Sequence, residues 1–177
     1  MEQLPWKKIH EHLAYNGYRK ILRKKFRLPN DTEEDYDILT QNDPVCVLAL
    51  TQTHRVILAR QFRPGLEKFF DELPSGLLEN NETPFAGAER ELLEETGYKG
   101  NLTFVRKFPE WAYGNSYIHS FIAHDCVKVQ EPCTDEGEFI TVVIKSLADF
   151  ITQVRQGELT NTDAAYRSLD YLNQLKL

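Results

Sequence analysis

Three carboxylates at helical spacing are the residues of this chain best suited to chemistry. Glu91, Glu94 and Glu95 stand at positions i, i+3 and i+4. On a helix this spacing places all three on one face, roughly 5–6 Å apart. Like charges so close repel one another unless a cation lies between them, and hard divalent cations prefer oxygen ligands. The spacing indicates a metal site, although an acidic run alone is also typical of a solvated helix face.

The helix that would carry these acids has recognisable ends. Thr83 is a suitable N-cap, and Pro84 suits the first helical position, where its missing N–H costs nothing. Gly97 is placed to adopt the left-handed conformation that ends a helix. We therefore predict a helix over residues 84–96, with its acids on the face opposite an apolar stripe. The stripe consists of Phe85, Ala88, Leu92 and Leu93.

A longer pattern surrounds this helix. Gly76 is followed, after five residues, by Glu82, and seven further residues separate Glu82 from the run that begins at Arg90 and ends at Tyr98. The run reads RELLEETGY. The whole arrangement resembles the signature of the Nudix hydrolases, with every defining position filled. The resemblance implies a loop–helix–loop metal site.

Composition limits the remaining possibilities. The chain has 177 residues, 41% of them hydrophobic, which suits one domain with or without a small extension. A net charge of −6 argues against a general affinity for nucleic acid. We find neither an apolar run of about 20 residues for a membrane helix nor the apolar segment of a secretory signal. Because Cys46, Cys126 and Cys133 include no CxxC pair, neither a disulfide framework nor a zinc site is expected. We expect a cytoplasmic protein, with Cys46 and Cys126 buried.

The remaining elements must position the acidic helix. Residues 17–28 and 33–40 are expected to form a hairpin, separated by a turn signal, in an extension over residues 1–42. A Nudix domain is expected over residues 43–177. Its strands and helices alternate, which predicts an α/β fold with a mixed sheet, and the resemblance implies the same α/β/α sandwich. The predicted strands are 45–50, 56–59, 102–105, 117–123 and 139–144, and the later helices are 146–155 and 162–175.

The flanking sequences narrow the resemblance. Residues 61–64, QFRP, and 72–76, ELPSG, are similar to those of the ADP-ribose pyrophosphatase branch, which also carries an N-terminal hairpin. The resemblance implies a homodimer that exchanges its hairpins and binds an ADP-sugar in a shared cleft. One position departs from the branch: where members preferring ADP-ribose usually have a proline, this chain has Tyr113. Trp111 and Tyr113 could stack on a base or pack within their loop.

The resemblance also assigns metal ligands. It implies Mg²⁺, with Mn²⁺ as a possible substitute, held principally by Glu91 and Glu95. Glu94 and the backbone carbonyl of Ser75 would complete the protein ligands. Arg90 would hold the acids in position through charge-assisted hydrogen bonds.

Other residues are candidates for the substrate and for the attacking water. In this branch the general base often comes from an acidic loop before the last strand, here residues 134–139; our first choice is Glu136 and our second is Glu138. Arg60 and Arg63 are candidates for phosphate binding, because a guanidinium matches phosphate oxygens. Glu72 would face a ribose hydroxyl or a metal.

The expected reaction is Mg²⁺-dependent hydrolysis of the pyrophosphate bond in a nucleoside diphosphate linked to another group. ADP-ribose, giving AMP and ribose 5-phosphate, is the leading substrate. A GDP-sugar, a dinucleotide or an oxidised nucleotide is the alternative within enzymes. A non-catalytic module that binds a nucleotide sugar is the alternative from another class, but such modules typically lack signature glutamates that are present here. The sequence leaves the base, the sugar, the number of metal ions and the pathway open.

Overall fold

The computed structural model describes residues 5–134 and 136–175, which form two compact units. The first unit contains the chain up to Asn42 together with Pro109–Tyr117. The second contains Asp43–Phe108 and the chain from Ile118 onward. The loop that carries Trp111 and Tyr113 thus groups with the N-terminal segment, whereas the predicted extension comprised residues 1–42 alone.

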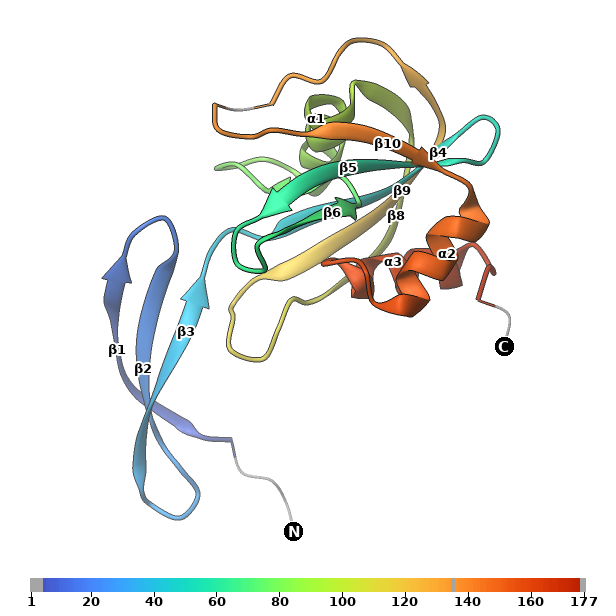
Figure 1. Cartoon of the computed structure of the whole chain (residues 1–177). Helices are drawn as coiled ribbons and strands as arrows, with labels where there is room; N and C mark the ends of the chain where they lie inside the picture. The colour runs from blue at the N-terminus through green and yellow to red at the C-terminus, as the bar shows by residue number, and fades with distance from the viewer. Residues whose placement is uncertain (1–4, 135, 176–177) are drawn as a thin grey trace. The chain divides into compact units, whose positions relative to one another are not determined.

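The first unit is a three-stranded antiparallel sheet with the order β1-β2-β3 (Figure 1). It consists of β1 (Lys7–Asn16), β2 (Lys20–Arg27) and β3 (Glu33–Thr40). The predicted hairpin corresponds to β2 and β3. The prediction missed β1, which adds a third strand beside β2. The register of β1 against β2 shifts between Lys8 and His10 and again between Leu13 and Tyr15. These irregularities break the two-residue alternation by which a strand is recognised in a sequence.

The second unit contains a mixed sheet, as predicted, and this sheet has seven strands. Its main path is β10-β5-β4-β9-β8, with β6 beside β5 and β7 beside β4. The pairing of β4 with β9 is parallel and that of β4 with β5 is antiparallel. The strands are β4 (Pro44–Thr51), β5 (Val56–Arg63), β6 (Lys68–Glu72), β7 (Ser75–Leu77), β8 (Tyr98–Pro109), β9 (Tyr117–Lys128) and β10 (Thr141–Lys145). The helices are α1 (Pro84–Thr96), α2 (Leu147–Gln156) and α3 (Thr162–Tyr171).

Helices cover both faces of this sheet, which confirms the predicted α/β/α sandwich (Figure 1). Strand β4 supplies alternate side chains to two hydrophobic clusters, because successive strand residues point to opposite faces. Cys46, Leu48 and Leu50 pack with residues of α2 and α3. Val45 and Val47 pack with residues of α1. Residues 45–50 form a continuous apolar run because this strand is buried on both faces.

Several boundaries differ from those predicted. β8 follows α1 directly and is much longer than residues 102–105. The last strand begins at Thr141 rather than at Phe139, whose side chain is exposed. α3 ends at Tyr171 rather than at residue 175, and Asn173 has a positive φ of 55° that no helix continues through.

Burial of Cys46 and Cys126 is confirmed, and the ends of α2 are fixed by local contacts. Ser146 caps α2 by accepting a hydrogen bond from the N–H of Asp149, and Gly157 ends that helix with a φ of 72°. Cys46 and Cys126 are buried, and burial raises the pKa of the Cys126 thiol to about 11. None of the helices in the described ranges is long and apolar enough to cross a membrane.

Candidate active site

The capped helix over residues 84–96 is confirmed. The hydroxyl of Thr83 accepts a hydrogen bond from the N–H of Ala86 at 3.3 Å, and Pro84 occupies the first turn. Gly97 has a φ of 75°, and its N–H donates to the carbonyl of Leu93 at 2.8 Å. Local sequence thus fixes where α1 begins and ends, and hence which residues share a face.

Two of the acids of α1 are buried, a feature that the sequence pattern did not predict. Glu91 and Glu95 are only 9% and 4% exposed, whereas Phe85 of the predicted core stripe is 50% exposed. The loop before the helix explains this burial, because it covers the acidic face. A Cβ atom on Gly76 would lie 2.0 Å from Oε1 of Glu91, so the glycine lets the loop backbone approach that carboxylate.

One guanidinium organises three of the carboxylates. Arg90 donates to Glu91 Oε1 at 2.7 Å and to Glu94 Oε2 at 3.0 Å. It also donates to both carboxylate oxygens of Glu82, at 2.8 and 3.0 Å, and to the carbonyl of Leu77 at 3.1 Å. Charge-assisted bonds of this kind hold side chains firmly. Arg90 therefore ties the helix to the loop that precedes it.

The Glu95 carboxylate is buried, and a backbone N–H compensates only part of its charge. Its Oε2 accepts the N–H of Ser75 at 3.0 Å. Burial raises the pKa of Glu95 well above its ordinary value, and the charge of Glu91 raises it further. Burial also raises the pKa of Glu91, against the opposing effect of Arg90. Two buried carboxylates that resist ionisation would be stabilised as anions by an added cation.

The donor set fits a hard divalent cation. It offers the carboxylate oxygens of Glu91, Glu94 and Glu95, together with the backbone of Ser75 beside them. In the described parts of the chain, no three His, Cys, Asp or Glu side chains already converge as a metal cluster. The salt bridges to Arg90 account for part of this separation, because they hold Glu91 and Glu94.

The close approach at Gly76 leads to a prediction. In Gly76→Ala, the new methyl group would meet the carboxylate of Glu91, which burial and Arg90 hold in place. We expect turnover to fall by at least about tenfold, since displaced support around a metal typically costs 10- to 100-fold. Steady-state kinetics at saturating cation would measure it. Gly65→Ala is the matched control, because a Cβ there meets no atom within 4 Å; equal activity in both variants would contradict the prediction.

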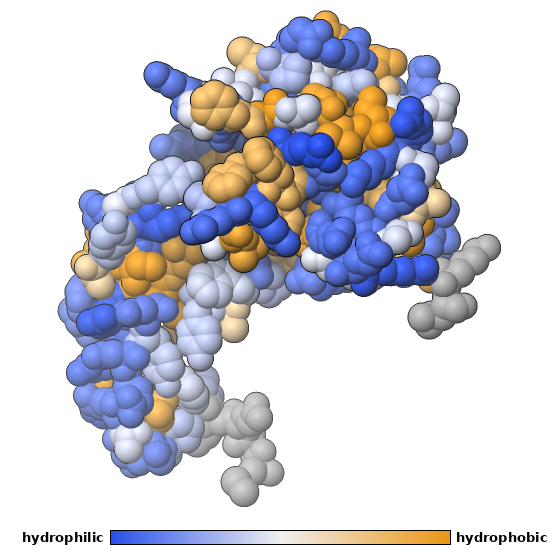
Figure 2. All heavy atoms as spheres, in the orientation of Figure 1, coloured by the Kyte–Doolittle hydropathy of each residue, from blue (hydrophilic) through white to orange (hydrophobic). Residues whose placement is uncertain are grey.

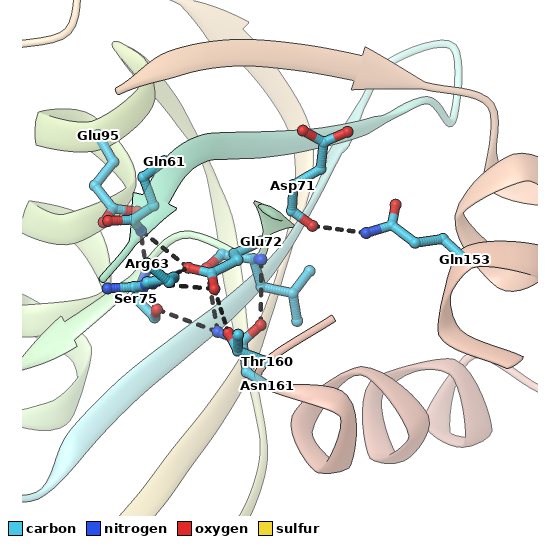
Figure 3. Close-up of polar contacts among 10 residues, drawn as sticks. Gln61, Arg63, Asp71, Glu72, Ser75, Glu95, Gln153, Thr160 and Asn161 are labelled. Carbon is cyan, nitrogen blue, oxygen red and sulfur yellow. Dashed lines mark hydrogen bonds and ion pairs between the residues drawn. The ribbon is translucent and has the colours of Figure 1, made fainter. Parts of the chain in front are cut away.

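Arg63 is held by a fully buried carboxylate (Figure 3). Glu72 is 0% exposed and accepts hydrogen bonds from Gln61 Nε2 at 3.0 Å, from Arg63 and from the hydroxyl of Thr160. The Arg63 side chain remains 39% exposed. In this arrangement Glu72 orients Arg63, and its oxygens face protein donors; the contact with a ribose or a metal stays a prediction. Arg60 forms a comparable pair with Asp71, at 2.5 and 3.0 Å.

Sequence reasoning missed two residues beside this group. Thr160 and Asn161 lie in the connection between α2 and α3, yet they contact Glu72, Leu73 and Ser75 (Figure 3). Some 88 positions separate Asn161 from Leu73, so no local pattern could reveal the contact. The one available signal was an asparagine immediately before a predicted helix.

The two candidates for the general base, Glu136 and Glu138, differ in their electrostatic effect on the acids of α1. Glu136 and Glu138 are both exposed, and Asp135 between Thr134 and Glu136 lies outside the described residues. The charge of Glu138 contributes to the raised pKa of both Glu91 and Glu95. Glu136 is not among the principal contributors to either pKa. Among the described residues, Glu138 is thus the carboxylate of this loop that contributes to both raised pKa values.

The fold and this site define the class of protein. The NUDIX domain model matches residues 40–167. The chain therefore belongs to the Nudix family, whose hydrolases generally need a divalent metal, and it is a Nudix pyrophosphohydrolase.

Individual relatives and a solved structure narrow the comparison within this family. The chain is 36% identical over 182 residues to an ADP-ribose pyrophosphatase of Bacillus subtilis (strain 168), covering 99% of this chain and 96% of that protein. It is 51% identical over 116 residues to an ADP-sugar pyrophosphatase of Mus musculus, covering 61% of this chain and 53% of the mouse protein. A crystal structure of an ADP compounds hydrolase superposes with a TM-score of 0.81 at 18% identity, covering 99% of this chain and 100% of that one, which shows a shared fold.

Proposed function

We propose that the chain hydrolyses the pyrophosphate bridge of ADP-ribose, or of a related ADP-sugar, to AMP and a sugar phosphate, with Mg²⁺ as its metal and Mn²⁺ as a substitute. The observation that carries the proposal is the buried pair Glu91 and Glu95 facing the loop at Ser75 and Gly76. Full-length similarity to an ADP-ribose pyrophosphatase supports the choice of substrate.

The residues of α1 would hold the metal. Glu91 and Glu95 are its principal ligands, and Glu94 and the carbonyl of Ser75 complete the set. A bound cation offsets phosphate charge and lowers the pKa of a coordinated water. Arg90 holds Glu91 and Glu94 in position through its hydrogen bonds to both carboxylates.

Arg63 would bind a phosphate oxygen of the substrate. The Arg63 side chain is partly exposed, and its guanidinium donates hydrogen bonds to the buried carboxylate of Glu72. The buried carboxylate thus removes the conformational freedom that a long side chain would otherwise lose on binding. Arg60 has the same pattern with Asp71, although its guanidinium is more exposed, and serves as a second contact.

Glu138 would accept the proton of the attacking water. Its influence on the pKa of Glu91 and Glu95 supports Glu138 as the general base in preference to Glu136, our first choice from the sequence. Gly137, with a φ of 99°, lets the loop turn sharply between the two glutamates.

A substrate panel tests the proposed function. The protein would be incubated with Mg²⁺ and equal concentrations of ADP-ribose, GDP-mannose, a dinucleotide and an oxidised nucleoside triphosphate, and the products separated and identified. We expect AMP and ribose 5-phosphate from ADP-ribose at the highest kcat/KM. Faster cleavage of a different diphosphate would reassign the substrate, and binding of ADP-ribose without cleavage would contradict the enzyme.

The raised pKa values of Glu91 and Glu95 lead to a prediction about metal and pH. A carboxyl whose folded pKa is raised stabilises the fold while protonated, and that contribution is lost as pH rises through the folded pKa. Because Mg²⁺ competes with protons for these oxygens, it should raise the melting temperature more at pH 8 than at pH 5. At about 100 times its Kd, a cation adds roughly 2.7 kcal/mol. Thermal melts with chelator and with Mg²⁺ at both pH values measure this; an equal gain at both would contradict it.

We also infer a homodimer with exchanged N-terminal hairpins, as the resemblance implies. The first unit offers little burial to its own apolar side chains: Ile9, Leu13 and Tyr15 on β1 are all substantially exposed. Hydrophobic atoms appear at its surface among charged side chains (Figure 2). A small sheet with an exposed edge strand is marginally stable by itself and invites pairing.

The dimer is tested with the full-length chain. We expect the mass of two chains by light scattering at micromolar concentration, and a single band of that mass after mild crosslinking. Leu13→Lys should weaken the association, because it places a charge among apolar side chains that would be buried. A fully active wild-type monomer under the same conditions would contradict both the dimer and a shared cleft.

A further inference from the structure

We infer that Asn161 is a positioning residue for the metal site, acting through the backbone of Leu73–Ser75. The inference rests on the proposed function. It concerns the α2–α3 connection, which lies far along the chain from the Nudix signature and which no sequence pattern of that signature includes.

The first observation is that Asn161 precedes α3 without capping it. Asparagine is among the preferred N-cap residues because its side-chain oxygen accepts a hydrogen bond from the helix. Here the side chain of Asn161 makes no such bond, and only its backbone carbonyl accepts, from the N–H of Ala165 at 3.2 Å. Ser146 at the start of α2 shows the usual arrangement in the same protein.

The side-chain amide of Asn161 instead forms hydrogen bonds with Leu73 and Ser75. Its Oδ1 accepts from the N–H of Leu73, and its Nδ2 donates to the carbonyl of Leu73, both at 3.4 Å. The same Nδ2 donates to the hydroxyl of Ser75 at 3.2 Å (Figure 3). One amide group thus engages both polar backbone groups of Leu73 and the side chain two residues later.

The third observation connects this clamp to the acids. The N–H of Ser75 donates to Oε2 of Glu95, and the carbonyl of Pro74 accepts from the N–H of Val47 on β4. Residues 73–75 are therefore fixed by β4 on one side and by Asn161 on the other. The carbonyl of Ser75, a proposed metal ligand, belongs to this segment, so its direction depends on both supports.

Neighbouring contacts make the connection a rigid support. Gln153 of α2 donates from Nε2 to the carbonyl of Asp71 at 2.7 Å and to the carbonyl of Glu158 at 2.9 Å. Thr160 donates to Glu72. Together, α2 and the connection therefore contact residues 71, 72, 73 and 75, and Asn161 is the residue that contacts Ser75.

The test compares Asn161→Ala with Ser146→Ala, which removes the side-chain cap of α2. Mg²⁺ would be titrated into each purified full-length protein by calorimetry, and Mg²⁺ dependence of activity measured at saturating substrate. We expect Asn161→Ala to need at least about tenfold more Mg²⁺ in both titrations, as for other supports of metal ligands. Ser146→Ala should lower the melting temperature while keeping the wild-type Mg²⁺ midpoint.

A second variant guards against misfolding. Asn161→Asp keeps the acceptor for the N–H of Leu73 but loses both donations, so it should also raise the Mg²⁺ requirement. Unshifted midpoints in the folded Asn161 variants, or equal shifts in Ser146→Ala, would overturn this inference alone. A wild type whose activity and heat of binding are insensitive to Mg²⁺ would overturn the proposed function, and the inference with it.

Discussion

Glu95→Gln is expected to abolish most of the activity while leaving the metal-free protein as stable as the wild type, or more stable. Changes in residues that merely support a metal ligand cost 10- to 100-fold, so loss of a direct ligand charge should lower kcat by more than about 100-fold. The glutamine keeps the size of the side chain and can still accept the N–H of Ser75.

The expected gain in stability has a separate cause. Glu95 is 4% exposed, and burial penalises its charged form. Replacing the carboxylate with a neutral amide removes that penalty near neutral pH. Thermal melts in chelator would detect it, and Glu89→Gln, at an exposed position of the same helix, is the control. A variant that is inactive because it is unfolded, or one with wild-type kcat, would contradict the role given to Glu95.

Glu138→Gln is expected to lower kcat by roughly 10²- to 10⁴-fold, the usual contribution of a general base, while Mg²⁺ binding by calorimetry stays close to that of the wild type. The reason is that Glu138 influences the acids of α1 through its charge, yet is itself exposed and available to a water molecule. Removing its charge should, if anything, make Glu91 and Glu95 easier to ionise.

Glu136→Gln is the matched control, because it changes the same residue type two positions away in the same exposed loop. We expect it to retain activity near that of the wild type. An inactive Glu136→Gln beside an active Glu138→Gln would restore the order first chosen from the sequence. Activity in both single variants would move the base out of this loop.

Sequence reasoning succeeded where the signal is local. The caps Thr83 and Gly97 determine the ends of α1 through bonds to residues within a few positions, so they could be predicted without tertiary structure. The same holds for Ser146 and Gly157 at the ends of α2. Once those ends are known, the shared face of the signature glutamates follows from helical geometry.

It failed where the signal depends on packing between distant segments. The charge pattern does not reveal that Glu91 and Glu95 are buried, because that burial involves the close approach of the loop at Gly76 to Glu91. Strand β1 was missed because irregular pairing disturbs its alternation. Asn161 was missed because its partners are some 88 residues away.

The roles of the arginines were only partly predictable. A guanidinium suggests phosphate binding because it matches phosphate oxygens, but nothing local shows that Glu72 lies fully buried against Arg63. Arg60 and Asp71 face each other directly across the antiparallel ladder of β5 and β6, whereas Glu72 faces Ala59, which lies four positions before Arg63 on β5. Cross-strand neighbours of this kind require the register, which the sequence does not state.

The central claim is that the acids of α1 bind a divalent cation that pyrophosphate cleavage requires. The most direct measurement is AMP release from ADP-ribose by protein treated with chelator, followed before and after addition of excess Mg²⁺. We predict negligible AMP before addition, and AMP with an equal amount of ribose 5-phosphate afterwards. The same rate of AMP release in both conditions, or no cleavage after Mg²⁺ is added, would contradict the claim.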